Sequence, residues 1–91
     1  MADLIGHPNR MDGIKLHIVS PEGTLVETTV SAVTLPGTVG PFEVLKNHAA
    51  LISSLEKGEI VYLSEGAEQR LPIASGFVEV RDNQVDVCVE V

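Results

Sequence analysis

The sequence predicts an all-β protein, a single antiparallel β-sandwich or flattened barrel of about ten short strands. Turn-forming glycine, proline and asparagine residues recur roughly every ten residues, a spacing typical of antiparallel sandwiches. The segments between these turns are extended in pattern, and none shows the period of a helix. Aromatic residues make up only 3% of the chain, so the core must consist of valine, isoleucine and leucine. The β-branched members of this set favour strands.

The length of the chain, 91 residues, corresponds to one domain. Residues 1–12 show no hydrophobic period and are predicted to form a flexible leader, whereas residues 13–91 are predicted to form the sandwich. A domain of this size holds a hydrophobic core but no deep, enclosed active site.

The net charge of −7 argues against nucleic acid or an anionic membrane surface as a direct partner, because both are bound through basic patches. The single cysteine, Cys88, excludes an internal disulfide and fits a reducing compartment. No apolar run approaches the roughly 20 residues needed to cross a bilayer, and the N-terminus has no apolar signal core. We therefore expect a protein that stays inside the cell and reaches a membrane only through a partner.

The first third of the chain reads as two extended segments joined by a turn at residues 21–23. Residues 13–20 alternate, with Ile14, Leu16 and Ile18 on one face and the polar Lys15 and His17 on the other. Residues 24–35 are extended throughout, but their apolar side chains change face along the segment. A bulge or bend near Ser31 would reconcile the two halves.

Further strands are predicted at residues 49–55, 59–64 and 69–74, separated by glycine-containing turns. Pro72 lies within the last of these and cannot donate a hydrogen bond to a neighbouring strand. That strand is therefore expected at the edge of a sheet or beside a bulge.

Residues 77–91 form the clearest hairpin, closed by the two-residue turn Asp82-Asn83, which tolerates positive φ. The turn sets a register that pairs Arg81 with Gln84, Val80 with Val85, and Val78 with Val87. The alternation then predicts a set of inward valines: Val78, Val80, Val85, Val87, Val89 and Val91. Phe77 and Cys88 fall opposite each other on the outer face, where the other positions are mostly charged. Two facing apolar residues there predict an interaction surface.

The stretch at residues 35–51 differs from the rest of the chain. It carries two turn signals, Pro36-Gly37 and Gly40-Pro41, then a segment at residues 42–45 that is long enough for only a short strand, and a further turn at residues 46–48. This composition predicts a wide loop folded back on itself and pinned by Phe42 and Leu45. Rigid loops on a sheet scaffold are common places for binding residues.

Residues that could perform chemistry are scattered. The three histidines, at positions 7, 17 and 48, are not at ligand spacing from one another or from Cys88. Ser53 and Ser54 lack the glycine elbow of a nucleophile, and the segment 37–40 lacks the Gly-Lys-Ser/Thr of a phosphate loop. We expect no catalytic residue, no metal site and no cofactor, and hence a protein that is not an enzyme.

Three stretches together resemble the epsilon subunit of F-type ATP synthases. They are IVSPEG at residues 18–23, VTLPGTVGPFEVLKNHAAL at 33–51 and ASGFVEV at 74–80, in the order and spacing of that family. The resemblance implies the N-terminal β-sandwich domain of a non-catalytic rotor subunit in the central stalk. Such a subunit joins the gamma subunit to the polar loops of the membrane ring of c subunits, and so links ATP synthesis to proton transport. It is peripheral, at the cytoplasmic face of the bacterial plasma membrane.

The resemblance also implies two contact surfaces. Residues at family positions facing the membrane ring are Val39, Pro41, Glu43 and His48, and those expected to face gamma are Ala49, Ile52, Phe77 and Cys88. Val39 and Pro41 stand where family members usually carry glutamates, so Glu43 is the acid available there. An alternative for His48 is a turn residue that bonds to its own loop.

Many members of this family continue into a two-helix hairpin that can inhibit ATP hydrolysis and, in some, bind ATP. Because this sequence ends at Val91, we expect neither such a latch nor ATP binding. Two other readings remain. An unrelated β-sandwich module for carbohydrate or peptide would need clustered exposed aromatic residues, and the three present are scattered. A small barrel enzyme of the cupin type would need clustered histidines.

Overall fold

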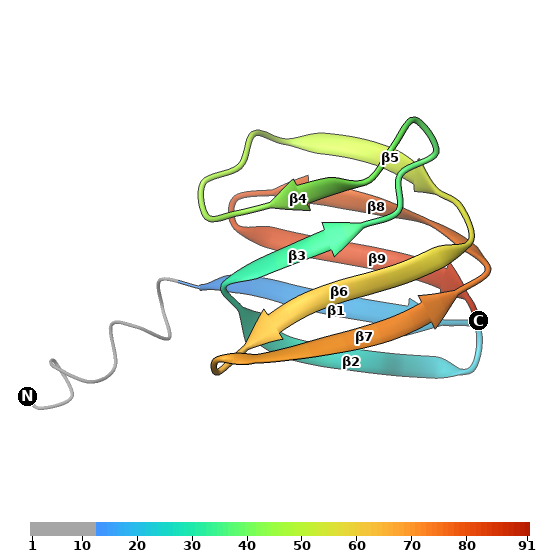
Figure 1. Cartoon of the computed structure of the whole chain (residues 1–91), viewed down its shortest axis with the longest axis horizontal. Helices are drawn as coiled ribbons and strands as arrows, with labels where there is room; N and C mark the ends of the chain where they lie inside the picture. The colour runs from blue at the N-terminus through green and yellow to red at the C-terminus, as the bar shows by residue number, and fades with distance from the viewer. Residues whose placement is uncertain (1–12) are drawn as a thin grey trace, which may run out of the picture.

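The computed structural model describes residues 13–91, which form two sheets packed face to face (Figure 1). One sheet has the order β2-β1-β9-β8-β5 and the other the order β4-β3-β6-β7. The strands are β1 (Ile14–Ser20), β2 (Gly23–Val30), β3 (Ala32–Leu35), β4 (Phe42–Val44), β5 (Leu51–Leu55), β6 (Gly58–Ser64), β7 (Ala67–Ile73), β8 (Ser75–Arg81) and β9 (Gln84–Glu90). The predicted all-β sandwich is therefore confirmed, with nine strands in the described part of the chain. The leader predicted at residues 1–12 lies outside the described residues.

The predicted bend near Ser31 is where the chain passes from one sheet to the other. β2 ends at Val30 in the first sheet, and β3 begins at Ala32 in the second. The N–H of Ser31 donates to the carbonyl of Leu63 on β6 at 2.9 Å, which holds the crossing point against the second sheet. The change of face in the sequence thus marks a change of sheet.

The β8–β9 hairpin has the register that its turn predicts. Arg81 pairs with Gln84, and Phe77 pairs with Cys88. Asp82 and Asn83 have φ of 51° and 60°, the left-handed conformation that a two-residue hairpin turn of this kind requires. The valines that alternate from Val78 to Val89 are buried, but Val91 is 69% exposed. The inward placement predicted for Val91 is wrong, because β9 ends at Glu90 and Val91 has no strand beside it.

The core lies between the two sheets and consists of aliphatic side chains. No buried polar or charged residue occurs within residues 13–91. The fully buried side chains come from both layers and include Ile14, Leu16, Ile18, Val33, Leu35, Ile60, Val78, Val80, Val85 and Val87. Close packing of this kind makes the sandwich a stiff body.

One pairing departs from the antiparallel pattern: β1 and β9 run parallel, with Lys15 beside Gln84 and Val19 beside Cys88. Parallel neighbours cannot be joined by a tight turn, and here they are strands far apart in the sequence. Local alternation carries no information about such a pairing. β1 therefore lies in the interior of its sheet, between β2 and β9.

Pro72 lies on β7, which is an edge strand of the second sheet, as its missing N–H predicts. No helix of the described chain has the length and apolar character needed to span a membrane.

Candidate functional site

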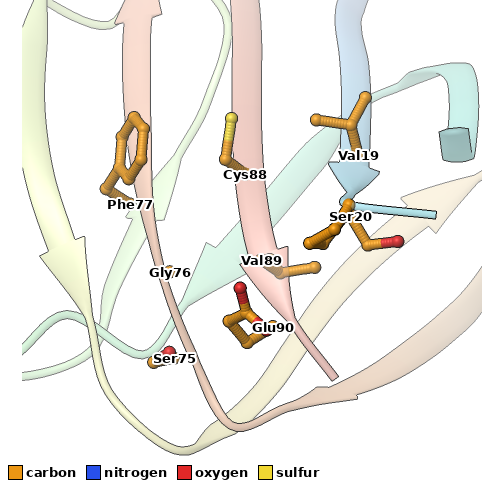
Figure 2. Close-up of a pocket in the computed structure, with 9 residues that line it drawn as sticks. Val19, Ser20, Ser75, Gly76, Phe77, Cys88, Val89 and Glu90 are labelled. Atoms are coloured by element: carbon orange, nitrogen blue, oxygen red, sulfur yellow. The ribbon is translucent and has the colours of Figure 1, made fainter. Parts of the chain in front are cut away.

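Three apolar side chains lie side by side across the outer face of the five-stranded sheet (Figure 2). Val19 on β1 is beside Cys88 on β9, and Cys88 is beside Phe77 on β8. Phe77 is 55% exposed, and Cys88 is also exposed. We call Val19, Cys88 and Phe77 the apolar row. It confirms the predicted outward and facing positions of Phe77 and Cys88, and adds Val19.

An open groove of about 520 Å³ runs beside the apolar row. Its lining residues come from β1, β8, β9 and the β1–β2 turn, and include Val19, Ser20, Pro21, Gly76, Phe77 and Cys88. Gly76 lines the groove where β8 and β9 lie close together. A Cβ at this position would collide with the carbonyl oxygen of Cys88 and press on Val89, so the β8 and β9 backbones approach here as only glycine permits.

The neighbouring rows of the same face are charged. His17 Nδ1 lies 3.7 Å from a carboxylate oxygen of Asp86, and Arg81 Nε lies 3.8 Å from a carboxylate oxygen of Glu79. These side chains are substantially exposed, so each pair contributes little to stability. The outer face is thus divided along the strands into a charged part near the β8–β9 turn and an apolar part near the opposite end.

The residues predicted to contact gamma share this side of the molecule. Ile52 lies on β5 beside Glu79 of β8, with its side chain 76% exposed on the same outer face as Phe77. Ala49 is exposed in the connection that precedes β5. Ser54, the next outward residue of β5, pairs with Phe77. The structure therefore brings Ile52, Phe77 and Cys88 onto one outer face, whereas Ala49 lies in the segment beside the β8–β9 turn.

The loop predicted to face the membrane ring divides into two segments at opposite ends of the sandwich. Residues 36–41 connect β3 to β4 and lie beside the end of β5. The N–H of Thr38 donates to the carbonyl of Ser54 at 3.2 Å, and the two hydroxyl oxygens are 3.0 Å apart. The N–H of Glu56 donates to the carbonyl of Pro36 at 2.9 Å. This segment is at the end that also contains the groove.

The second segment, residues 45–50, lies at the opposite end, beside the β8–β9 turn (Figure 1). His48 is half-buried, and its Nδ1 lies 2.7 Å from the carbonyl oxygen of Ala49. His48 thus bonds within its own loop, which is the alternative considered above. Val39 and Pro41 belong to the first segment, His48 to the second, and Glu43 to β4 between them. The expectation that these four residues form one broad surface is wrong, because β4 carries the chain from one end to the other.

Only one of the two residues expected to pin this loop does so. Phe42 packs on the core, and its ring fills the space in front of Gly37. Leu45 is 51% exposed and points away from the core. Its position follows β4 directly, where the backbone has already left the sheet.

The described residues contain no group of three or more His, Cys, Asp or Glu side chains placed to hold a metal ion. Val19 was missed in the sequence, although its place in the alternation of β1, on the same face as Lys15 and His17, already puts it on the outer face. That it stands next to Cys88 depends on the parallel pairing of β1 with β9, which no local pattern reveals.

Known proteins resemble the chain over nearly all of the described residues. Residues 13–91 match a family described as the β-sandwich domain of the ATP synthase delta/epsilon chain. An ATP synthase epsilon chain of Desulfitobacterium hafniense is 43% identical over 75 residues, covering 82% of this chain and 57% of the relative. An epsilon chain of Nitratiruptor sp. is 43% identical over 81 residues, covering 88% of this chain and 63% of the relative. The chain thus spans about three fifths of the length of these relatives.

Solved structures agree with this assignment. A chain of the Euglena gracilis mitochondrial ATP synthase, solved as an OSCP/F1/c-ring assembly, superposes with a TM-score of 0.79 and 26% identity. The superposition covers 86% of this chain and 51% of that one. A chain of the Tetrahymena thermophila ATP synthase central stalk/c-ring shares the fold, with a TM-score of 0.74 and 14% identity over 87% of this chain and 64% of that one. By its family match, its relatives and its fold, the chain belongs to the ATP synthase delta/epsilon-chain family, of which it contains the β-sandwich domain.

Proposed function

We propose that this protein is a non-catalytic rotor subunit of an F-type ATP synthase, which joins the gamma subunit to the membrane ring in the central stalk. Family membership supports the complex, and the two solved neighbours belong to assemblies that contain the c-ring. The observation that carries the proposal is the apolar row on the outer face of the five-stranded sheet, beside rows of charged side chains. The stiffness of a close-packed sandwich suits a part that transmits torque.

The gamma subunit is proposed to dock on the outer face of the five-stranded sheet. The contact comprises Phe77 and Cys88 of the apolar row, Ile52 on β5 and Ala49 in the connection before β5. A large, exposed aromatic side chain beside a groove is a common kind of binding hot spot. Covering the row would remove apolar surface from water, whereas the ion pairs around it are rim contacts that set orientation.

The membrane ring is proposed to contact the end of the sandwich formed by residues 36–41. Val39 is fully exposed there, and Pro41 and the two tight turns restrict the backbone, so little conformational entropy is lost on docking. Glu43, exposed on β4, is the acid nearest in sequence to this end. His48 is left out of the contact because its loop lies at the opposite end. Held in this way, the subunit would be peripheral at the cytoplasmic face of a bacterial plasma membrane and would support ATP synthesis driven by proton transport.

The direct test is co-expression with the gamma subunit of the same organism, followed by affinity purification through a tag on gamma. We expect a stoichiometric complex with the wild-type chain and loss of the complex when Phe77 is replaced by aspartate. Absence of a complex with the folded wild-type chain would overturn the proposal.

A further inference from the structure

The two sheets have four edge strands, and three of them carry features that discourage pairing with another chain. β7 contains Pro72 and an ion-pair network in which Arg70 contacts Glu59 at 3.0 Å and Glu68 at 2.6 Å. The hydrogen bond to Glu59 and the charge of Glu68 raise the pKa of Arg70 above its ordinary value. Charged residues and proline on an edge strand are typical features that prevent its pairing with a strand of another chain.

The edge strands β2 and β4 carry other features that discourage pairing with another chain. β2 pairs with β1 through a register shift between Ile18 and Val19, and it carries the exposed Glu27. β4 has three residues, with Pro41 before it and Glu43 at its centre. A bulge, a charge or a very short strand each makes continuous pairing with an added strand unfavourable.

β5 has none of these features. Its sequence, Leu-Ile-Ser-Ser-Leu, contains no charge, proline or glycine, and its register with β8 is unbroken. The chain that leads into it, Ala49-Ala50, has small exposed side chains that leave the approach to the edge open. In Figure 1 β5 lies at the top of the molecule, at the edge of its sheet and beside β8.

The free backbone groups of this edge can be assigned from the hydrogen bonds beside them. The carbonyl of Ser54 accepts a hydrogen bond from the N–H of Thr38, and the N–H of Glu56 donates one to the carbonyl of Pro36. The even-numbered residues of β5 therefore direct their main-chain N–H and C=O groups away from β8. Ile52 has the same parity, and its N–H and C=O therefore point outward from the edge. Within residues 13–91, the segment that pairs on this side reaches only Leu55, through the bridge from Gly37. Among the described residues, none pairs with the outward N–H and C=O of Ile52.

We propose that an extended strand of the gamma subunit pairs with β5 at Ile52 and continues the five-stranded sheet. The partner chemistry follows from the edge: one main-chain N–H and one C=O to meet those of Ile52, and an apolar side chain beside Ile52 on the outer face. Because Ile52 and Phe77 share that face, strand pairing and docking on the apolar row form one continuous contact. The inference rests on the proposed function, since it takes gamma as the partner.

The test distinguishes the contribution of the Ile52 main-chain N–H to gamma binding from the contribution of its side chain. Ile52→Pro removes the outward N–H, and because that N–H faces away from β8, the β5–β8 pairing is preserved. Ile52→Ala removes most of the same side chain but keeps the N–H, which makes it the matched control. Affinity for purified gamma is measured for both variants and the wild-type chain by calorimetry, and folding is checked by circular dichroism.

We expect Ile52→Pro to weaken gamma binding about tenfold more than Ile52→Ala does, a difference of about 1.4 kcal/mol. Equal losses in the two variants would show contact by side chains alone and would overturn strand pairing. The proposed function would survive that result if Phe77→Asp still abolished binding. If the wild-type chain failed to bind gamma at all, the proposed function itself would fail.

A second measurement does not depend on the proline variant folding. Hydrogen exchange at the Ile52 amide of the wild-type chain is expected to slow at least about tenfold when gamma is bound, because the amide gains a partner. Unchanged exchange at Ile52 in the complex would overturn the proposal. The proposal would also be overturned if the chain alone formed a homodimer that persists in the Ile52→Ala variant and dissociates in the Ile52→Pro variant. A second copy of the chain would then occupy the edge.

Discussion

Asn47 and Asn83 hydrogen-bond to each other across the end of the sandwich, although they lie in different turns. The main-chain N–H of Asn47 donates to Oδ1 of Asn83 at 2.5 Å, and Nδ2 of Asn83 donates to Oδ1 of Asn47 at 3.2 Å. Both residues have positive φ, 67° and 60° respectively. Asparagine tolerates this conformation better than most residues. The pair ties the loop before β5 to the β8–β9 turn.

Replacing Asn83 should therefore reduce stability by two separable amounts. Asn83→Gly keeps the backbone conformation but loses both hydrogen bonds, at an expected cost of about 1 kcal/mol in the free energy of unfolding. Asn83→Ala loses the same bonds but keeps a Cβ at positive φ without the polar side chain that makes this conformation tolerable for asparagine, so it should cost about 1 kcal/mol more than Asn83→Gly. Urea unfolding of the two variants measures the difference. Equal stabilities would mean that the backbone strain is relieved by rearrangement of the turn.

Phe77→Asp should leave the chain folded while reducing gamma binding by about 2 kcal/mol or more, as expected for a hot-spot aromatic residue. The side chain lies on the outer face, so its loss creates no cavity in the core. Leu63→Asp is the control, because Leu63 is a partly exposed apolar residue on the other sheet. The measurement is a pull-down with tagged gamma beside a thermal melt. Unfolding of Phe77→Asp alone would place Phe77 in the core and remove it from the docking surface.

Cross-linking should identify the end of the sandwich that faces the membrane ring. In a Cys88→Ser background, cysteine at position 39 or 41 is expected to form a disulfide with a cysteine in the polar loop of the ring. Cysteine at position 48 is expected not to react, because the Asn47–Asn83 contact places it at the opposite end. Non-reducing electrophoresis of membranes reports the products. Linkage from position 48 together with none from 39 or 41 would mean that the sandwich is docked in the reverse orientation.

Two isoleucines, one buried and one exposed, allow the effect of burial on stability to be compared for the same side chain. Ile60 on β6 is 0% exposed, whereas Ile52 is 76% exposed. Ile60→Ala should lower the free energy of unfolding by about 2–5 kcal/mol, through lost burial and the cavity left behind. Ile52→Ala should change it by no more than about 0.5 kcal/mol in the isolated chain. Denaturant midpoints measured in parallel would decide. A large effect at Ile52 would show that its side chain is covered within the folded chain.

The parts of the fold that follow from neighbours in sequence were predictable. The Asp82-Asn83 turn has two residues, so it fixes which residues of β8 and β9 face each other, and alternation then places Phe77 outward. The face change near Ser31 and the proline in β7 likewise act locally. Each of these features is determined within a few residues, and the structure contains each one.

The parts that depend on distant segments were not predictable from pattern. Turn signals at residues 36–41 and 46–48 look like one loop because only a short segment separates them. The length of that segment predicts the short strand β4, but not its pairing with β3, which carries the chain across the sheet. The exposure of Leu45 and the place of Val19 beside Cys88 have the same origin. They depend on which strands become neighbours, and residue type alone does not encode this.

The parallel contact between β1 and β9 has a consequence for how the chain acquires its structure during synthesis. β1 is made among the first segments, but one of its two neighbours is made among the last, since Lys15 pairs with Gln84. Until β9 has left the ribosome, the five-stranded sheet lacks its central strand and the apolar face of β1 is only partly covered. Contacts between such distant segments slow folding, because the chain entropy must be lost before the contact forms. The nascent chain should therefore remain sensitive to proteases until residues 84–90 emerge, and then become resistant in a single step.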